Sequence, residues 1–266
     1  MSENLVLNIS ALAALAPSML IAWRREKKRD ALYWAVLALA VAGPLALVTV
    51  TMSGSWNKGL STSLWVTIGA SMSIFAIVAA ATRQGWRLTP LIAPYMGGLG
   101  VIAIIWQHAP QTQLAADAPA GWIQVHIFFS VATYGLVTIA AVAALGAFLQ
   151  ERALKAKRPT ALTRMLPSVA DCEFLLVRLL VIGEIVLAIG LATGMATQFR
   201  ETGQFIVFDH KTILSLTAFV VIGGLLVAHF RSGLRGRLAA RFVLLAYLLL
   251  TLGYPGVKFV TEVLMS

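Results

Sequence analysis

Residues 123–149, IQVHIFFSVATYGLVTIAAVAALGAFL, decide the class of fold. These 27 residues contain no Asp, Glu, Lys or Arg. About 20 predominantly apolar residues cross the hydrocarbon core of a bilayer as an α-helix. The stretch therefore predicts a transmembrane helix.

The composition of the whole chain agrees with this. Its 266 residues are 59% hydrophobic and 12% charged, with a mean hydropathy of +0.84, whereas soluble domains carry about 45–50% apolar and about 25% charged residues. These values exclude a water-soluble globule, and the low charge excludes a disordered chain. The single Cys172 excludes a disulfide framework, a CxxC thiol relay and a CxxCH haem-attachment site.

Eight apolar runs of this length predict an all-α membrane bundle, in one membrane domain over residues 1–266. No window alternates at period two for long enough to suggest a β-barrel, and no soluble domain of useful size is left between the runs. The predicted spans are Leu5–Trp23, Ala31–Val50, Thr62–Thr82, Thr89–Trp106, Ile123–Leu149, Phe174–Thr197, Thr212–Phe230 and Ala239–Val260.

The basic residues predict the orientation. Sixteen of the 21 lie in alternate connections: Arg24, Arg25, Lys27, Lys28, Arg29, Arg83, Arg87, Arg152, Lys155, Lys157, Arg158, Arg164, Arg231, Arg235, Arg237 and Arg241. The other side holds only Lys58, Arg200, Lys211 and Lys258. Because cytoplasmic loops are enriched in Lys and Arg, both termini are predicted outside. The basic residues in the predicted cytoplasmic loops then account for the net charge of +10, and no nucleic-acid partner is expected.

Three of the four histidines gather at the predicted outer face. His108 follows the fourth span, His126 opens the fifth and His210 precedes the seventh, whereas His229 lies near the cytoplasmic end of the seventh span. Imidazole is the commonest metal ligand and an axial ligand of haem iron. Solvated interfacial histidines are the alternative, and the residues alone leave both open.

The two long outer connections, residues 107–122 and 198–211, differ in chemistry. The first ends in Trp122, which is typical of a membrane-interface anchor. The second mixes apolar rings with charges. This composition could bind a flat macrocycle with propionate groups, and it is equally typical of an amphipathic segment that lies on the membrane surface. Its side chains of interest are Phe199, Arg200, Glu201, Phe205, Phe208, Asp209 and Lys211.

Ionisable residues inside the membrane are candidates for function. The sixth span contains Arg178 and Glu184. Their separation of six residues turns them about 240° apart on an ideal helix, so they do not face each other. In the fifth span His126, Ser130 and Tyr134 share related faces with Thr133, which predicts either helix packing or the lining of a cavity.

Four segments resemble the cytochrome c assembly proteins, the CcsA/CcmC-type membrane haem handlers. VHIFFSVATYGLVTIAAVAALGAFLQER resembles the family's His-Val-x-x-x-x-x-x-Tyr helix, and DCEFLLVRLLVIGEIVLAIGLATGMA its acidic-x-x-x-x-x-Arg helix with a Ser/Thr-Gly step. VFDHKTILSLTAFVVIGGLLVAHFR stands at the place of the Trp-Asp-Pro-Lys-Glu motif, and GYPGVKF resembles Tyr-Phe-Gly-Val-Asn. The resemblance covers residues 122–259, which leaves residues 1–106 as a variable four-helix part.

This resemblance implies non-covalent, b-type haem bound at the outer face and presented to an apocytochrome, alongside other assembly proteins in a bacterial inner membrane. His126 matches an outer haem ligand and His229 a ligand of a second haem within the membrane. Asp209 and Lys211 match the motif's aspartate and lysine. Beside these, we expect His210 as a candidate ligand, packing by Trp122, Phe205 and Phe208, and charge neutralisation by Arg200 and Lys211.

The chain departs from the family pattern in the outer connection, where phenylalanines replace the motif's tryptophans and His210 replaces its proline. It most resembles a shorter branch labelled as inner-membrane cytochrome-c-assembly-like proteins. The leading hypothesis is haem handling. A transporter or transporter subunit using Glu184 and Arg178 is the alternative, and a ligand-free membrane scaffold is a third. An enzyme is the weakest reading, since no hydrolytic or thiol motif is present.

Overall fold

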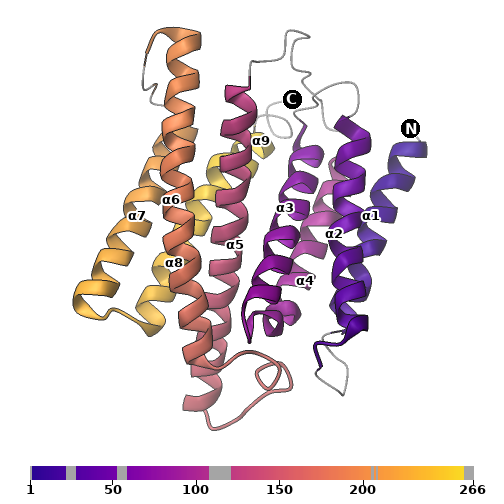
Figure 1. The fold of residues 1–266 in the computed structure, drawn as a ribbon, viewed down its shortest axis with the longest axis vertical. Coiled ribbons are helices and arrows are strands. Elements are labelled where there is room, and N and C mark those ends of the chain that lie inside the picture. Colours follow the sequence, from indigo (N-terminus) through magenta and orange to yellow (C-terminus); the bar gives the residue numbers. More distant parts are fainter. Residues whose placement is uncertain are drawn as a thin grey trace.

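A computed structural model describes residues 2–21, 28–52, 59–107, 121–204, 207 and 209–260 of the chain. Within this part every regular element is helical (Figure 1). The elements are α1 (Ser2–Ile21), α2 (Ala31–Met52), α3 (Leu60–Ala81), η1 (Gly85–Leu88), α4 (Thr89–Ile105), α5 (Trp122–Lys155), α6 (Val169–Thr202), α7 (His210–Ser232), α8 (Gly236–Thr251), η2 (Leu252–Gly256) and α9 (Val257–Phe259).

The prediction of eight transmembrane helices in an all-α bundle is confirmed. Eight helices in the described part are long and apolar enough to cross a membrane. They run side by side, up and down, and the two described ends of the chain lie at the same end of the bundle (Figure 1). We call this the terminal end and the opposite one the basic end. Which end faces the cytoplasm stays a prediction from the basic residues.

The largest departure from the predicted boundaries is in α5 and α6. Both helices run for 34 residues, beyond the predicted spans 123–149 and 174–197. The additional residues at the basic end are charged or polar but good helix formers, such as Gln150, Glu151 and Lys155. Helical hydrogen bonding therefore continues past the apolar run, and the connection between α5 and α6 projects below the other helices in Figure 1.

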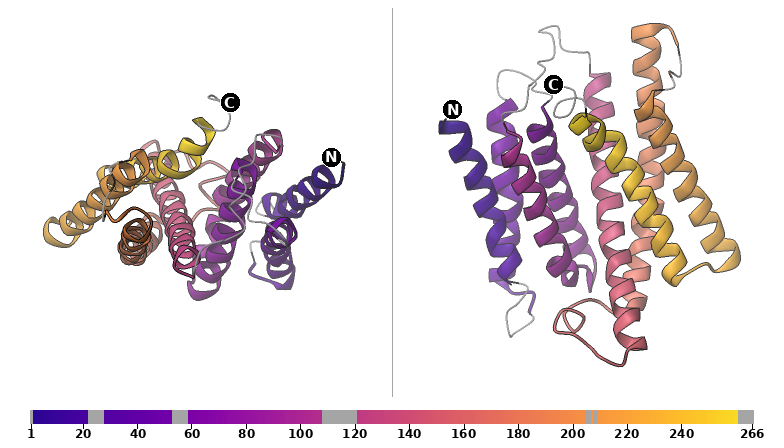
Figure 2. Two further views of the ribbon diagram at one scale, coloured as in Figure 1. Left: turned by 90° about the horizontal axis from the view of Figure 1, so that it is seen from above. Right: turned by 180° about the vertical axis from the view of Figure 1, so that it is seen from behind.

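The helices pack mainly with their neighbours in the chain. α5 lies against α6 along most of its length, and α8 packs on α5 and α7. The helices α1, α2, α3 and α4 form the other half of the bundle, which contacts the second half chiefly through α3 and α5. Figure 2 shows this arrangement from above, with α3 and α5 in the middle. α5 thus carries its side chains into the centre of the molecule.

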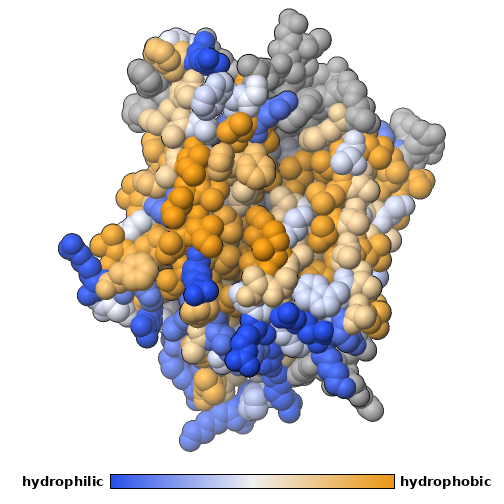
Figure 3. All heavy atoms as spheres, viewed as in Figure 1, coloured by the Kyte–Doolittle hydropathy of each residue, from blue (hydrophilic) through white to orange (hydrophobic). Residues whose placement is uncertain are grey.

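The polarity of the surface follows the two ends. A band of hydrophobic residues covers the middle of the visible face, and hydrophilic residues gather at the basic end (Figure 3). Such a band is what the hydrocarbon core of a bilayer requires of a helix bundle. At the start of α2 and in η1, Trp34 and Trp86 pack edge-on around Tyr33, and such aromatic residues are typical of membrane interfaces.

Candidate functional site

His126 lies in the second turn of α5, at the terminal end, and is half-buried against α6. Its Nδ1 is 3.0 Å from the carbonyl oxygen of Gly190 and 3.4 Å from the hydroxyl of Thr193. The Ser130 hydroxyl lies 3.5 Å from Nε2. The half-buried imidazole is therefore held by contacts with both α5 and α6.

The partner of Nδ1 identifies the tautomer of the neutral ring. A carbonyl oxygen can only accept a hydrogen bond, so Nδ1 of His126 carries the hydrogen and donates it to Gly190. Nε2 then holds the lone pair. Metal-binding histidines commonly donate their other ring N–H to a carbonyl or carboxylate in this way. The donor chemistry of His126 thus fits an axial ligand of haem iron.

His210 opens α7 at the same end of the bundle. It is exposed, as is its neighbour Lys211. Asp209 caps the helix because its Oδ1 accepts a hydrogen bond of 2.7 Å from the backbone N–H of Thr212. Burial alone would raise the pKa of the Asp209 carboxyl, but the hydrogen bonds from Thr212 and the nearby charges of Lys211 and His210 lower it below its ordinary value.

The structure does not bring His126 and His210 into contact. α7 packs on α6 and α8, and it has no extensive contact with α5. The other predicted haem contacts are divided as well: Trp122 and Arg200 are exposed at the terminal end, and Phe205 and Phe208 lie outside the described residues. The assignment of these residues to a haem site stays a prediction.

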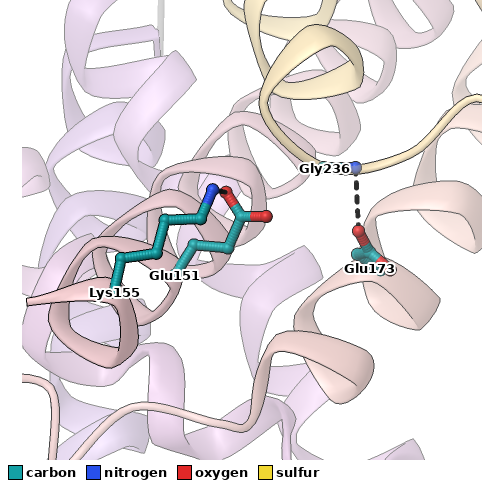
Figure 4. A network of polar contacts seen from close by, with 4 residues as sticks. All are labelled: Glu151, Lys155, Glu173 and Gly236. Carbon is teal, nitrogen blue, oxygen red and sulfur yellow. Dashed lines mark hydrogen bonds and ion pairs between the residues drawn. The ribbon is translucent and has the colours of Figure 1, made fainter. Parts of the chain in front are cut away.

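His229 has a different environment at the basic end. Its Nδ1 donates to the carbonyl oxygen of Leu234 over 2.9 Å, and its ring packs edge-on against Phe230. The neighbouring turn is also held from α6, where Glu173 accepts a hydrogen bond of 2.9 Å from the backbone N–H of Gly236 (Figure 4). The Nδ1 hydrogen bond of His229 therefore stabilises the turn between α7 and α8. Its Nε2 is the ring atom that remains for a ligand.

Arg178 and Glu184 face different surroundings, as their spacing predicted. Arg178 is exposed and lies over the ring of Phe174, 4.2 Å from its centroid. Glu184 is half-buried against α7, where a Cβ on Gly223 would lie 2.9 Å from its Oε1. The buried Oε2 of Glu184 has no hydrogen-bond partner among the described residues. The two charges do not form an intramembrane pair.

A cluster of tyrosines inside the membrane escaped the sequence analysis. The hydroxyl of Tyr247 on α8 is hydrogen-bonded to that of Tyr95 on α4 and lies 3.1 Å from that of Tyr134 on α5. Tyr134 is also 3.2 Å from Oγ1 of Thr251. Only Tyr134 stood in a recognised polar stripe, because residues on separate helices show no common spacing in a sequence.

Comparison with known proteins identifies the family. The family profile described as "Cytochrome C assembly protein" matches residues 30–265. An uncharacterised 28.8 kDa protein of Azospirillum brasilense is 53% identical over the full length of both chains. The inner membrane protein YpjD of Escherichia coli K12 is 27% identical over 96% of this chain and 94% of its own. Protein HemX of Brevibacillus brevis is 23% identical over 72% of this chain and 69% of its own. No solved structure matches the chain.

Proposed function

Because the chain belongs to the cytochrome c assembly protein family, we propose that it binds b-type haem non-covalently and presents it at the outer face of a bacterial inner membrane. The Escherichia coli relative is named an inner membrane protein, which supports this location. An apocytochrome and other cytochrome c assembly proteins are the proposed partners, beside the lipid around the spans. Both termini lie outside in this proposal.

The observation that carries the proposal is the hydrogen bond between His126 Nδ1 and the carbonyl oxygen of Gly190. It keeps the lone pair on Nε2, the form of imidazole that binds a metal. The iron of a haem, when bound, supplies the Lewis-acidic centre that this nitrogen ligates. His126 and the α6 residues around it are thus the defined part of the proposed site.

The remaining contacts come from residues at the terminal end. Trp122, which is 47% exposed, offers an apolar ring for the macrocycle, together with Phe205 and Phe208 of the outer connection. Arg200 and Lys211 provide cations for the propionates. His210, which is exposed at the start of α7, is the second histidine that would hold the iron in this proposal, and it would do so from α7 without contact with His126.

Visible spectra of the detergent-purified protein, oxidised and reduced, test the proposal. We expect a Soret band with sharp reduced bands in the wild type, lost or shifted in His126→Ala and in His210→Ala. Ser232→Ala, at an exposed position of α7 at the basic end, is the control, because it removes only a hydroxyl that bonds the Ala228 carbonyl of its own helix and should leave those bands in place. A protein that stays colourless after haem is supplied contradicts haem binding, and spectra that His126→Ala leaves unchanged contradict the assigned ligand.

The unpartnered Oε2 of Glu184 supports a second candidate, transport of a cation or small solute. Carboxyl groups within membrane helices commonly mark such pathways. The exposed Arg178 takes no part in it. Uptake into proteoliposomes that disappears in Glu184→Gln and persists in Arg178→Gln would favour transport, whereas equal uptake in all three proteins would exclude this role of Glu184.

A further inference from the structure

Three neighbouring residues of α6 contact the proposed ligand, and we propose that they position it for metal binding. Gly190, Thr193 and Gly194 form what we call the α6 seat of His126. The inference deepens the proposed function and rests on it, because a positioned ligand matters only where a metal is bound. In this proposal the α6 seat fixes the tautomer of His126. The tautomer in turn sets the strength of the bond between Nε2 and the metal.

The first support is the close approach of the imidazole to the backbone of α6 at a glycine, where a side chain would displace the ring. A Cβ at Gly194 would lie 2.9 Å from Cε1 and 3.2 Å from Nδ1 of His126. At Gly190, one turn away on the same interface, a Cβ would lie 3.7 Å from the Cβ of Phe129, an ordinary contact distance. The missing side chain at Gly194 therefore makes the space for the imidazole, and the one at Gly190 is not needed for it.

The second support is the hydrogen bonding around Nδ1. The Gly190 carbonyl oxygen accepts from Nδ1 over 3.0 Å and from the Thr193 hydroxyl over 3.0 Å. The Thr193 hydroxyl oxygen is itself 3.4 Å from Nδ1. Two oxygens of α6 thus surround the Nδ1 hydrogen. Because a bond to this hydrogen increases the electron donation of the opposite nitrogen, such partners tune both metal affinity and redox potential.

Ordinary helix packing makes a different prediction from positioning. A histidine that only fills space can adopt either tautomer. In that case a methyl group added on the facing helix would change the stability of the protein and not the tautomer of the ring. A positioned ligand keeps its hydrogen on Nδ1 and responds to Gly194 but not to Gly190. The two glycines therefore form a matched pair on one helix.

Nitrogen-15 NMR of the histidine-labelled, haem-free protein measures the tautomer directly, with the His126 signal identified by its loss in His126→Gln. We expect the Nδ1–H form in the wild type and in Gly190→Ala. Gly194→Ala should give a mixture of tautomers, because the added methyl group moves the ring from the Gly190 carbonyl. A wild type in the Nε2–H form, or identical spectra for both glycine variants, would overturn the inference.

The haem-loaded protein gives a second readout. Removing the hydrogen-bond partner of a metal-binding histidine typically lowers metal affinity about 10–100-fold. We therefore expect Gly194→Ala to bind haem more weakly by such a factor, and the haem that stays bound to have a higher midpoint potential. Thr193→Val should shift the potential. Its control, Thr197→Val, removes only a hydroxyl that bonds the Thr193 carbonyl of its own helix and should not. Equal potentials in all variants contradict the inference. A protein that takes up no haem contradicts the proposed function. In that case the NMR spectra of the haem-free protein still test whether the α6 seat fixes the tautomer of His126.

Discussion

Tyr134 and Tyr247, 113 residues apart in the chain, place their hydroxyl groups 3.1 Å from each other inside the bundle. The direction of the bonds follows from Thr251, whose hydroxyl donates to the Tyr247 carbonyl over 2.8 Å. Tyr134 must then donate to Thr251, Tyr247 to Tyr134, and Tyr95 to Tyr247. This chain of donors joins α4, α5 and α8, and hence the two halves of the bundle.

Tyr247→Phe should loosen that junction. It removes both hydrogen bonds of the central hydroxyl, and polar contacts between membrane helices average about 0.6 kcal/mol each. We expect a loss of about 1 kcal/mol in the free energy of unfolding, measured by SDS titration in mixed micelles. Tyr33→Phe is the control: it removes one bond, of 3.2 Å to Thr89, and should cost about half as much. Equal stability of Tyr247→Phe and the wild type would contradict a structural role for the cluster.

The connection between α5 and α6 should depend on Gln150. The side-chain amide nitrogen of Gln150 donates to the carbonyl oxygens of Thr163, Leu166 and Pro167, at 2.8, 3.3 and 2.8 Å. Gln150→Leu leaves these carbonyls without that donor, so trypsin should cut the connection after its exposed basic residues faster than in the wild type. Gln124→Leu, at an exposed position of α5 near the terminal end, is the control. Unchanged cleavage in Gln150→Leu would show that the other contacts suffice.

Asp209 predicts an acid-dependent term in stability. Its folded-state pKa is lowered, so its contribution is present above the ordinary carboxyl pKa of about 3.9 and is lost as the pH falls through the lower folded value. Asparagine caps helices as well as aspartate does. Asp209→Asn should therefore match the wild type near neutral pH and lose less stability below about pH 4. Asp209→Ala should lose about 1 kcal/mol at neutral pH. Parallel acid unfolding curves for wild type and Asp209→Asn would refute the titration of Asp209.

Cysteine labelling tests the orientation. The native Cys172 is buried, so only the introduced cysteines should react with the reagent. We expect an impermeant maleimide to label Gln124→Cys, at the terminal end, in intact spheroplasts. Leu154→Cys, at a 68% exposed position near the basic end, should react only after lysis. The reverse pattern would invert the predicted topology.

Much of the fold was predictable because each transmembrane span obeys a local rule. A run such as residues 123–149 must be helical in lipid, since its backbone polar groups have no other partners there. The ends of α5 and α6 were missed for a related reason: beyond the membrane, hydropathy no longer marks a helix, and Gln150 and Glu151 read as a connection.

The candidate site was predictable only in part. His126 was identifiable as a residue, and the resemblance supplied its expected role. Its contact with Gly190 and Gly194 joins residues more than 60 positions apart, and no periodicity within one helix specifies which face of α6 it meets. The same holds for the separation of His126 from His210, which follows from the packing of α7 on α6 and α8 and not on α5.

The sequence by itself determined the class of fold, the eight spans and the family, because hydrophobic length and residue identity are properties of single segments. The tertiary structure decided which nitrogen of His126 carries the hydrogen, that Glu184 lies against Gly223 without a partner for its Oε2 in the described part of the chain, and that three tyrosines meet. These depend on how the helices are rotated and paired. In lipid that choice rests on close packing between small residues and on scattered hydrogen bonds, which arise only once the helices have met.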